Sequence, residues 1–165
     1  MNKLELEEHR RVLQEVLSQY SPKDVFNFDE SALFYRLQPN KTLATSKLKG
    51  RKQPKDPITV AFCCNMDGSE KKDLVVIGRS ANPRCFKNTS IHQFPVQYYS
   101  TKKAWMTTHI FSQWLFKFNM EMHGRKVLLK IDNAASHKVI REYRNVEVYF
   151  LPPNMTAGSR NYLFI

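Results

Sequence analysis

Two short runs of the sequence each place one aspartate at or near the end of an alternating apolar stretch. They are VFNFDES at Val25–Ser31 and VLLKIDN at Val127–Asn133. If the two strands lie side by side, about 4.8 Å apart, Asp29 and Asp132 become neighbours at one edge of a sheet. Two such carboxylates repel by about 4 kcal/mol at an effective dielectric constant near 20. A divalent cation such as Mg²⁺ or Mn²⁺ relieves this repulsion, so the pattern indicates metal-assisted phosphodiester chemistry.

The same residue types also fit simpler roles. A single aspartate after a strand is often a turn former or a helix N-cap. The cysteines are Cys63, Cys64 and Cys85, which have no CxxC spacing, and the five histidines are scattered. A structural zinc site is therefore not expected. From spacing alone, both the metal pair and the turn-forming aspartates remain open.

The charge of the chain favours a polyanionic partner. The 165 residues carry a formal net charge of +11, and 42% of them are hydrophobic, which is typical of one folded domain. A field of this sign attracts nucleic acid, so we expect non-specific, salt-sensitive binding to DNA. No apolar run reaches the 18–20 residues that a membrane span needs, and the charged N-terminus does not resemble a signal peptide. We expect an intracellular protein.

Basic residues gather in two regions. Seven Lys or Arg side chains fall between Arg36 and Lys55, which suits either a phosphate-contacting loop or a nuclear-import signal. Residues 79–106 interleave basic and aromatic side chains, which suits either stacking on bases or packing of a loop on the core. We expect a nuclear location. The candidate nucleic-acid-binding residues are Lys47, Lys49, Arg51, Lys52, Lys55, Arg84, Lys87, Lys102 and Lys103.

Periodicity predicts a mixed sheet with helices. We expect a helix over residues 4–20, a hairpin of Val25–Asp29 with Ala32–Leu37, strands at Ile58–Asn65 and Leu74–Gly78, a short extended piece VQYYS, a helix from Thr107 or Thr108 to Met122, a strand at Val127–Ile131, a helical turn over Ser136–Tyr143, and a strand at Val146–Leu151. Antiparallel strands followed by crossover-linked parallel strands match the ribonuclease H-like fold, in which acids lie on the first and fourth strands.

Several collinear segments together resemble the DDE superfamily endonuclease domain of pogo/Tigger-type transposases, with relatives such as centromere protein B and jerky-like proteins. They are FNFDESALFYRLQPNKTLA, KGRKQPKDPITVAFCCNMDGSEKKDLVVIGRSANPRCFK, YYSTKKAWMTTHIFSQWL and VLLKIDNAASH…VEVYFLPPNMT. The resemblance covers about residues 20–156. It implies an α/β, ribonuclease H-like, mixed five-stranded sheet flanked by helices.

The resemblance also assigns residues. It implies that Asp29 and Asp132 are the catalytic acids and the ligands of two metal ions, Mg²⁺ or Mn²⁺. Asn133 and His137 match the second motif and are expected to support its turn, with phosphate contact as a further role. Glu30 matches as the neighbour of Asp29, but strand alternation points it to the other face.

The chain departs from the family pattern after LPPNMT, where the family continues into a helix that carries the third acid. Beyond Asp132 the only carboxylates are Glu142 and Glu147, and neither follows the last expected strand. We therefore expect a DDE domain without its catalytic C-terminal helix, nucleic-acid binding but catalytically degenerate. Two alternatives stay open: an active nuclease whose third ligand comes from Glu142 or a partner, and a protein-interaction scaffold without DNA function.

The expected organisation follows from the same resemblance. Residues 1–21 are expected to form a capping helix, residues 22–156 an incomplete DDE domain, and residues 157–165 a divergent tail. The family usually has DNA-binding helix-turn-helix domains ahead of this region, so the chain is expected to be truncated at both ends. Oligomerisation stays open.

Overall fold

The computed structural model describes residues 3–36, 57–87, 89–90 and 93–152. Its helices and strands are α1 (Lys3–Leu17), β1 (Val25–Phe34), β2 (Pro57–Asn65), β3 (Leu74–Gly78), β4 (Val96–Ser100), α2 (Thr108–Glu121), β5 (Val127–Asp132) and β6 (Val146–Leu151), with 3₁₀ turns η1 (Pro22–Asp24) and η2 (Arg84–Phe86). Within these residues, no helix is long and apolar enough to cross a membrane.

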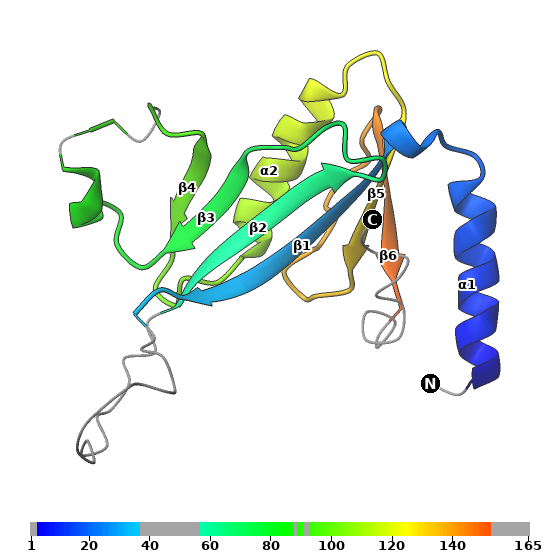
Figure 1. Ribbon diagram of the computed structural model, residues 1–165, viewed down its shortest axis with the longest axis horizontal. Helices are drawn as coiled ribbons and strands as arrows, with labels where there is room; N and C mark the ends of the chain where they lie inside the picture. Colours follow the sequence, from blue (N-terminus) through cyan, green and yellow to red (C-terminus); the bar gives the residue numbers. More distant parts are fainter. Residues whose placement is uncertain (1–2, 37–56, 88, 91–92, 153–165) are drawn as a thin grey trace, which may run out of the picture.

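One mixed sheet organises the fold, with strand order β4-β3-β2-β1-β5-β6 (Figure 1). Strand β2 pairs antiparallel with both β1 and β3, whereas β5 pairs parallel with β1 and β6 parallel with β5. Helix α2 makes the crossover that a parallel return to the sheet requires. This arrangement confirms the α/β, ribonuclease H-like fold expected from the sequence.

Three local expectations differ from the structure. Strand β1 runs unbroken to Phe34 and pairs with β2 along its length, so the expected hairpin of Val25–Asp29 with Ala32–Leu37 is wrong. The physical reason is that no Gly or Asn supplies a tight turn there, and β2 pairs with the strand up to Phe34. The piece VQYYS joins the sheet as β4, parallel to β3, which gives six strands where five were expected. Over Ser136–Tyr143 the chain makes turns and bends but no helix.

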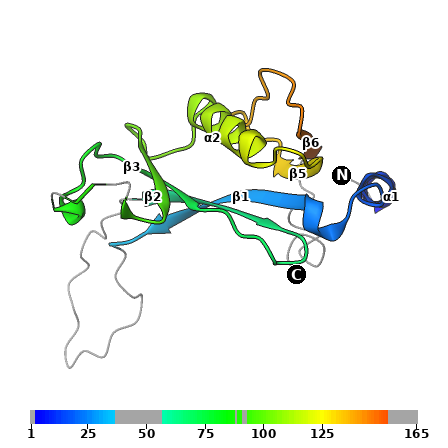
Figure 2. The same ribbon diagram turned by 90° about the horizontal axis from the view of Figure 1, so that it is seen from above.

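The core lies between α2 and one face of the sheet (Figure 2). Helix α2 begins where the Thr107 side chain accepts a hydrogen bond from the backbone N–H of Ile110, as a helix N-cap does. Its buried stripe includes Trp114 and Phe118. The ring of Phe28 lies 4.2 Å from Trp114, measured between centroids. Burying each such aromatic side chain contributes about 2–3 kcal/mol, so β1 and α2 hold each other in register.

Helix α1 packs at the β6 edge of the sheet (Figure 1). Leu13 and Leu151 form a small buried cluster there, and the Tyr20 hydroxyl donates a hydrogen bond of 2.7 Å to Oε2 of Glu147. Partial burial, together with this hydrogen bond and the Glu147 charge, raises the pKa of Tyr20 to about 12. The helix ends at Leu17, earlier than expected, which frees the backbone to turn toward β1.

Replacing Leu13 by Ala is expected to loosen α1 without unfolding the sheet. Loss of a buried leucine costs about 2 kcal/mol at the lower end of the usual range, which corresponds to an about 30-fold larger equilibrium constant for local opening of α1. Amide hydrogen exchange along α1 measures this. Leu4→Ala is the matched control because Leu4 is 77% exposed, and it should change exchange little. Equal effects of the two substitutions would show that α1 is not docked through Leu13.

Candidate active site

The two aspartates lie just beyond the end of the ladder that pairs β1 with β5. Strands β1 and β5 pair in parallel, and the last paired residues are Asn27 and Lys130. Asp29 and Asp132 each follow two residues later, toward the edge where the parallel strands end, and alternation places both on the face away from α2. Partial burial raises the pKa of Asp29, the backbone N–H of Glu30 opposes this, and the charge of Asp132 raises it further. The register of β1 and β5 thus brings the two aspartates to the same level on neighbouring strands.

His137 ties the second aspartate to β1. Its imidazole is 3% exposed and packs against Phe111 at 4.7 Å between ring centroids. Nε2 is hydrogen-bonded to Oε1 of Glu30 at 2.6 Å, and Nδ1 is hydrogen-bonded to the backbone carbonyl of Asp132 at 3.3 Å. Nδ1 also lies 2.5 Å from Oδ1 of Asp132, as an ion pair. Burial disfavours the charged ring, but the hydrogen bond to Glu30 and the charges of both carboxylates outweigh it and raise the pKa of His137. When the ring is protonated, its charge offsets part of the negative charge of the acidic pair.

Glu30 is the residue whose place in the site the sequence analysis missed. Alternation was right that its side chain leaves the Asp29 face. It nevertheless joins the site through His137, because the turn after β5 brings this ring back over the α2 face of β1. In that turn the backbone N–H of His137 donates to the carbonyl of Ala134. Only the short spacing of Glu30 from Asp29 hinted at this, and nothing in the sequence pairs Glu30 with His137.

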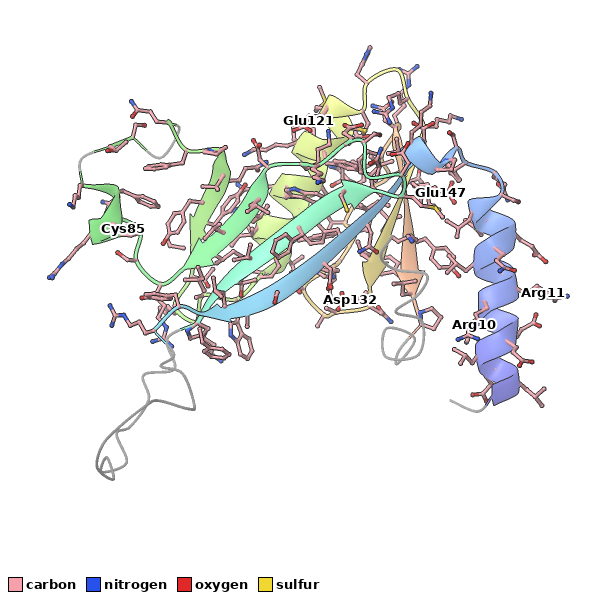
Figure 3. The ribbon with its side chains drawn as sticks, viewed as in Figure 1. Arg10, Arg11, Cys85, Glu121, Asp132 and Glu147 are labelled. Carbon is pink, nitrogen blue, oxygen red and sulfur yellow. The ribbon has the colours of Figure 1, made fainter. Side chains whose placement is uncertain are left out.

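The remaining carboxylates after Asp132 lie elsewhere. Glu147 pairs with Leu128 near the start of β6 and accepts the Tyr20 hydrogen bond, at the end of the sheet opposite Asp132 (Figure 3). Glu142 is exposed in the connection before β6. Across the part of the chain that the structure describes, no group of three His, Cys, Asp or Glu side chains is arranged to hold a metal ion.

The donor set fits one kind of cation. Mg²⁺ is commonly bound by one or two carboxylates, with water and phosphate oxygens completing its shell. The Asp29 residue is solvent-accessible although neighbouring atoms partly desolvate its carboxyl group, and Asp132 is half-buried, so a hydrated ion and a phosphate can reach both. Asn133 is exposed at the start of the turn. The pair fits an open site of this kind and does not form a closed cage.

The structure separates the candidate basic residues. Lys102 and Lys103 are exposed between β4 and α2, just after the C-terminal end of β4. Strands β1, β4 and β5 run in the same direction, so this is the end of the sheet toward which the aspartates lie. Arg84 and Lys87 belong to the η2 region beyond β3, on the opposite side of the sheet from β5 (Figure 1). The expected phosphate contacts at Lys47, Lys49, Arg51, Lys52 and Lys55 lie outside the described residues.

The proximity of the two acids can be measured directly. Substituting Asp132 by Asn removes a negative charge that raises the pKa of Asp29, so that pKa should fall. Carboxyl-carbon NMR titration of Asp29 in both proteins reports the change. Asp73→Asn, which removes an exposed charge near β3, is the control and should leave Asp29 unaffected. An Asp29 pKa that is the same with and without the Asp132 carboxylate would show that the two groups do not interact.

The Glu30–His137 contact should be worth more than a surface ion pair. Glu30→Gln is expected to lower the free energy of unfolding by about 1–2 kcal/mol, and by less in a His137→Gln background, because the two side chains share one hydrogen bond. Urea denaturation measures both. Glu8→Gln is the control, because its ion pair with Arg11 is exposed and contributes about 0–0.5 kcal/mol. Additive effects of Glu30→Gln and His137→Gln would contradict the contact.

Comparison with known proteins places this chain in a family. Residues 55–160 match the family model for the DDE superfamily endonuclease. The chain is 38% identical over 157 residues to Tigger transposable element-derived protein 4 of Mus musculus, covering 91% of this chain and 30% of that protein. It is 40% identical over 162 residues to CENP-B homolog protein 2 of Schizosaccharomyces pombe, covering 91% and 31%. The chain thus spans less than a third of these relatives.

A solved structure, the Mos1 transposase paired-end complex with left transposon end, aligns with a TM-score of 0.47 and 15% identity, covering 90% of this chain and 42% of that chain. The family model covers well over half of the sequence and includes Asp132. The chain therefore belongs to the DDE superfamily endonuclease family.

Proposed function

We propose that this chain binds DNA and holds a divalent cation, Mg²⁺ or Mn²⁺, between Asp29 and Asp132 for phosphodiester chemistry. The observation that carries the proposal is the β1–β5 register, which brings these two aspartates to the same level on neighbouring strands, in a chain of the DDE family. Isolated like charges there are unfavourable, and a cation with a phosphate ligand relieves them. Such an ion, when bound, polarises the phosphate and lowers the pKa of an attacking water.

The chain's own residues prepare this site in separate ways. Strand pairing positions Asp29, and the Glu30–His137 contact positions Asp132 from the opposite face of the sheet. His137 is a positioning residue, because its ring is buried behind the acids and both nitrogens are engaged. Rigid placement of this kind matters because small misplacements of a reacting group cost about 100-fold in rate.

We further propose that these 165 residues by themselves cleave DNA poorly. The described part of the chain supplies two acids on the open face of the sheet. Glu30 is engaged by His137 on the other face, Glu142 is exposed in the connection before β6, and Glu147 binds Tyr20 near the start of β6. With one ligand fewer, cation binding is weaker and the attacking oxygen is less well fixed. A third carboxylate from another segment or partner would restore activity.

The proposed partner is DNA in the nucleus, bound without strong sequence preference. The net charge of +11 supplies the attraction, and Lys102 and Lys103 lie at the end of the sheet toward which the acids lie. One relative is named ARS-binding protein 1, from Schizosaccharomyces pombe, 39% identical over 125 residues with 74% of this chain and 24% of that protein covered. The binding role for the present chain rests on charge and position.

Plasmid nicking tests the catalytic part. With Mg²⁺ or Mn²⁺, the chain should nick supercoiled DNA weakly or not at all, and Asp29→Asn and Asp132→Asn should remove any residual activity while Asp73→Asn retains it. Robust cleavage that depends on Asp29 and Asp132 would overturn the proposed degeneracy and establish an active nuclease. Cleavage that survives both substitutions would show that these acids are not the active site.

Salt dependence tests the binding part. Each neutralised phosphate contributes about −0.9 to the slope of log K against log salt. Replacing Lys102 and Lys103 together by Gln should therefore reduce the slope by about 2 in magnitude, as measured by fluorescence anisotropy with duplex DNA. Lys126→Gln, an exposed lysine at the opposite end of β5, is the control. Affinity for duplex DNA that does not change with salt would contradict the proposal.

A further inference from the structure

Trp105 is held outside the protein by a segment that is otherwise buried. Its side chain is 62% exposed, whereas its neighbours Ala104 and Met106 are 0% and 8% exposed. Single exposed hydrophobic residues are common, so exposure alone identifies nothing. Here, however, the chain buries both flanking residues and leaves the largest apolar side chain in water. The burial of Ala104 and Met106 therefore fixes the backbone so that the Trp105 side chain points into solvent.

The segment that presents Trp105 is fixed at several points. Thr101 Oγ1 accepts a hydrogen bond from the Trp105 backbone N–H and donates to the Trp105 carbonyl, at 3.0 and 3.1 Å. Thr59 Oγ1 on β2 donates to the carbonyl of Ala104 at 2.7 Å. Ala104 itself has a φ of 55°, a left-handed conformation that costs a non-glycine residue about 1–2 kcal/mol. Strain of this kind persists only where surrounding contacts enforce it, and it gathers at functional sites.

One cation packs on the indole. Lys103 Nζ lies 5.7 Å from the centre of the Trp105 ring, which is a cation–π geometry, and Lys102, exposed, precedes Lys103 in the sequence. A ring has two faces, so a second planar group can stack on the face that the ammonium group does not cover. An aromatic platform with lysines at its rim is the combination that single-stranded nucleic acid requires: a surface for the base and charges for its phosphates.

The platform and the aspartates lie toward the same end of the sheet, on different faces. Thr59, which anchors the segment from the α2 face, pairs with Ala32 on β1, three residues beyond Asp29. Three residues of a strand span about 10 Å, and the neighbouring strand adds about 4.8 Å. A DNA strand that passes round the end of the sheet, at about 3.4 Å for each base step, therefore joins a base on Trp105 to a phosphate at the acids over several nucleotides.

We propose that Trp105 stacks on an unpaired DNA base close to the phosphate bound at Asp29 and Asp132, with Lys102 and Lys103 holding the adjoining backbone. The ligand is thus a DNA end or junction with at least one unstacked base. The inference rests on the proposed function, because it needs DNA at this end of the sheet. It goes further in assigning a specificity-determining residue and a preferred form of the substrate.

Matched oligonucleotides separate stacking from charge. The full chain is titrated with a blunt duplex, the same duplex with a three-nucleotide 3′ overhang, and one whose overhang has the same phosphates but abasic sugars. The wild-type chain should prefer the normal to the abasic overhang by about 5- to 100-fold, the range for one stacked base. Trp105→Ala should abolish this preference without affecting the blunt duplex, and Trp105→Phe should retain part of it.

Two controls fix the interpretation. Lys103→Gln should weaken both overhangs alike. Phe116→Ala removes another exposed aromatic beside a cation, since Arg141 lies 4.4 Å from the Phe116 ring, and should keep the preference. In addition, indole fluorescence should be quenched by the normal overhang only, because the second tryptophan, Trp114, is 2% exposed and out of reach.

The outcomes distinguish the inference from the proposed function. Salt-dependent binding of the blunt duplex combined with equal affinity for the two overhangs would overturn the role of Trp105 and leave the proposed function intact. A preference for the normal overhang that survives in Trp105→Ala would also overturn it, by placing the stacking elsewhere. Failure of the wild-type chain to bind any of the three DNAs would remove the proposed function, and the inference with it.

Discussion

The parallel pairing of β1 with β5 is the constraint on which the rest of the site depends. It spans only three residue pairs, from Val25 with Leu128 to Asn27 with Lys130. Beyond that point β1 continues with β2, while β5 continues with β6 to Asp132. The two aspartates therefore come just after the last residues at which β1 and β5 are paired, where the two strands separate. Two like charges at this position repel each other, and solvent access to both residues reduces the cost.

Packing on the other face keeps this arrangement in place. Helix α2 covers the sheet with an aromatic stripe, and the ring of Phe28 contacts Trp114 and Phe111 directly below the acid-bearing edge. The imidazole of His137 extends the same aromatic cluster and adds hydrogen bonds to Glu30 and Asp132. A single buried side chain thus joins the hydrophobic core, the first strand and the second aspartate. The buried face thus helps to position the aspartate at the open face.

Much of this could be predicted from the sequence, because the signals were local. Alternation identified β5 and β6, the spacing of α2 identified its buried stripe, and Asp29 and Asp132 were placed on one edge by assuming that their strands pair. The length of β1 was missed because pairing with a strand distant in sequence, not a local turn, determines it. The Glu30–His137 contact was missed because 107 residues separate the partners and alternation alone points Glu30 away. The presentation of Trp105 was likewise hidden, since a left-handed Ala104 has no sequence signature.

Manganese binding tests the central claim most directly. Paramagnetic resonance of free Mn²⁺, followed during titration of the chain without DNA, reports the binding constant for the wild type, Asp29→Asn, Asp132→Asn and the double variant. If the two carboxylates share one ion, each single substitution should weaken binding by at least about 10-fold, and the double substitution should cost less than the sum of the two, because the first has already dismantled the site. Affinity that is unchanged by either substitution, or two losses that add independently, would show that Asp29 and Asp132 do not form one cation site.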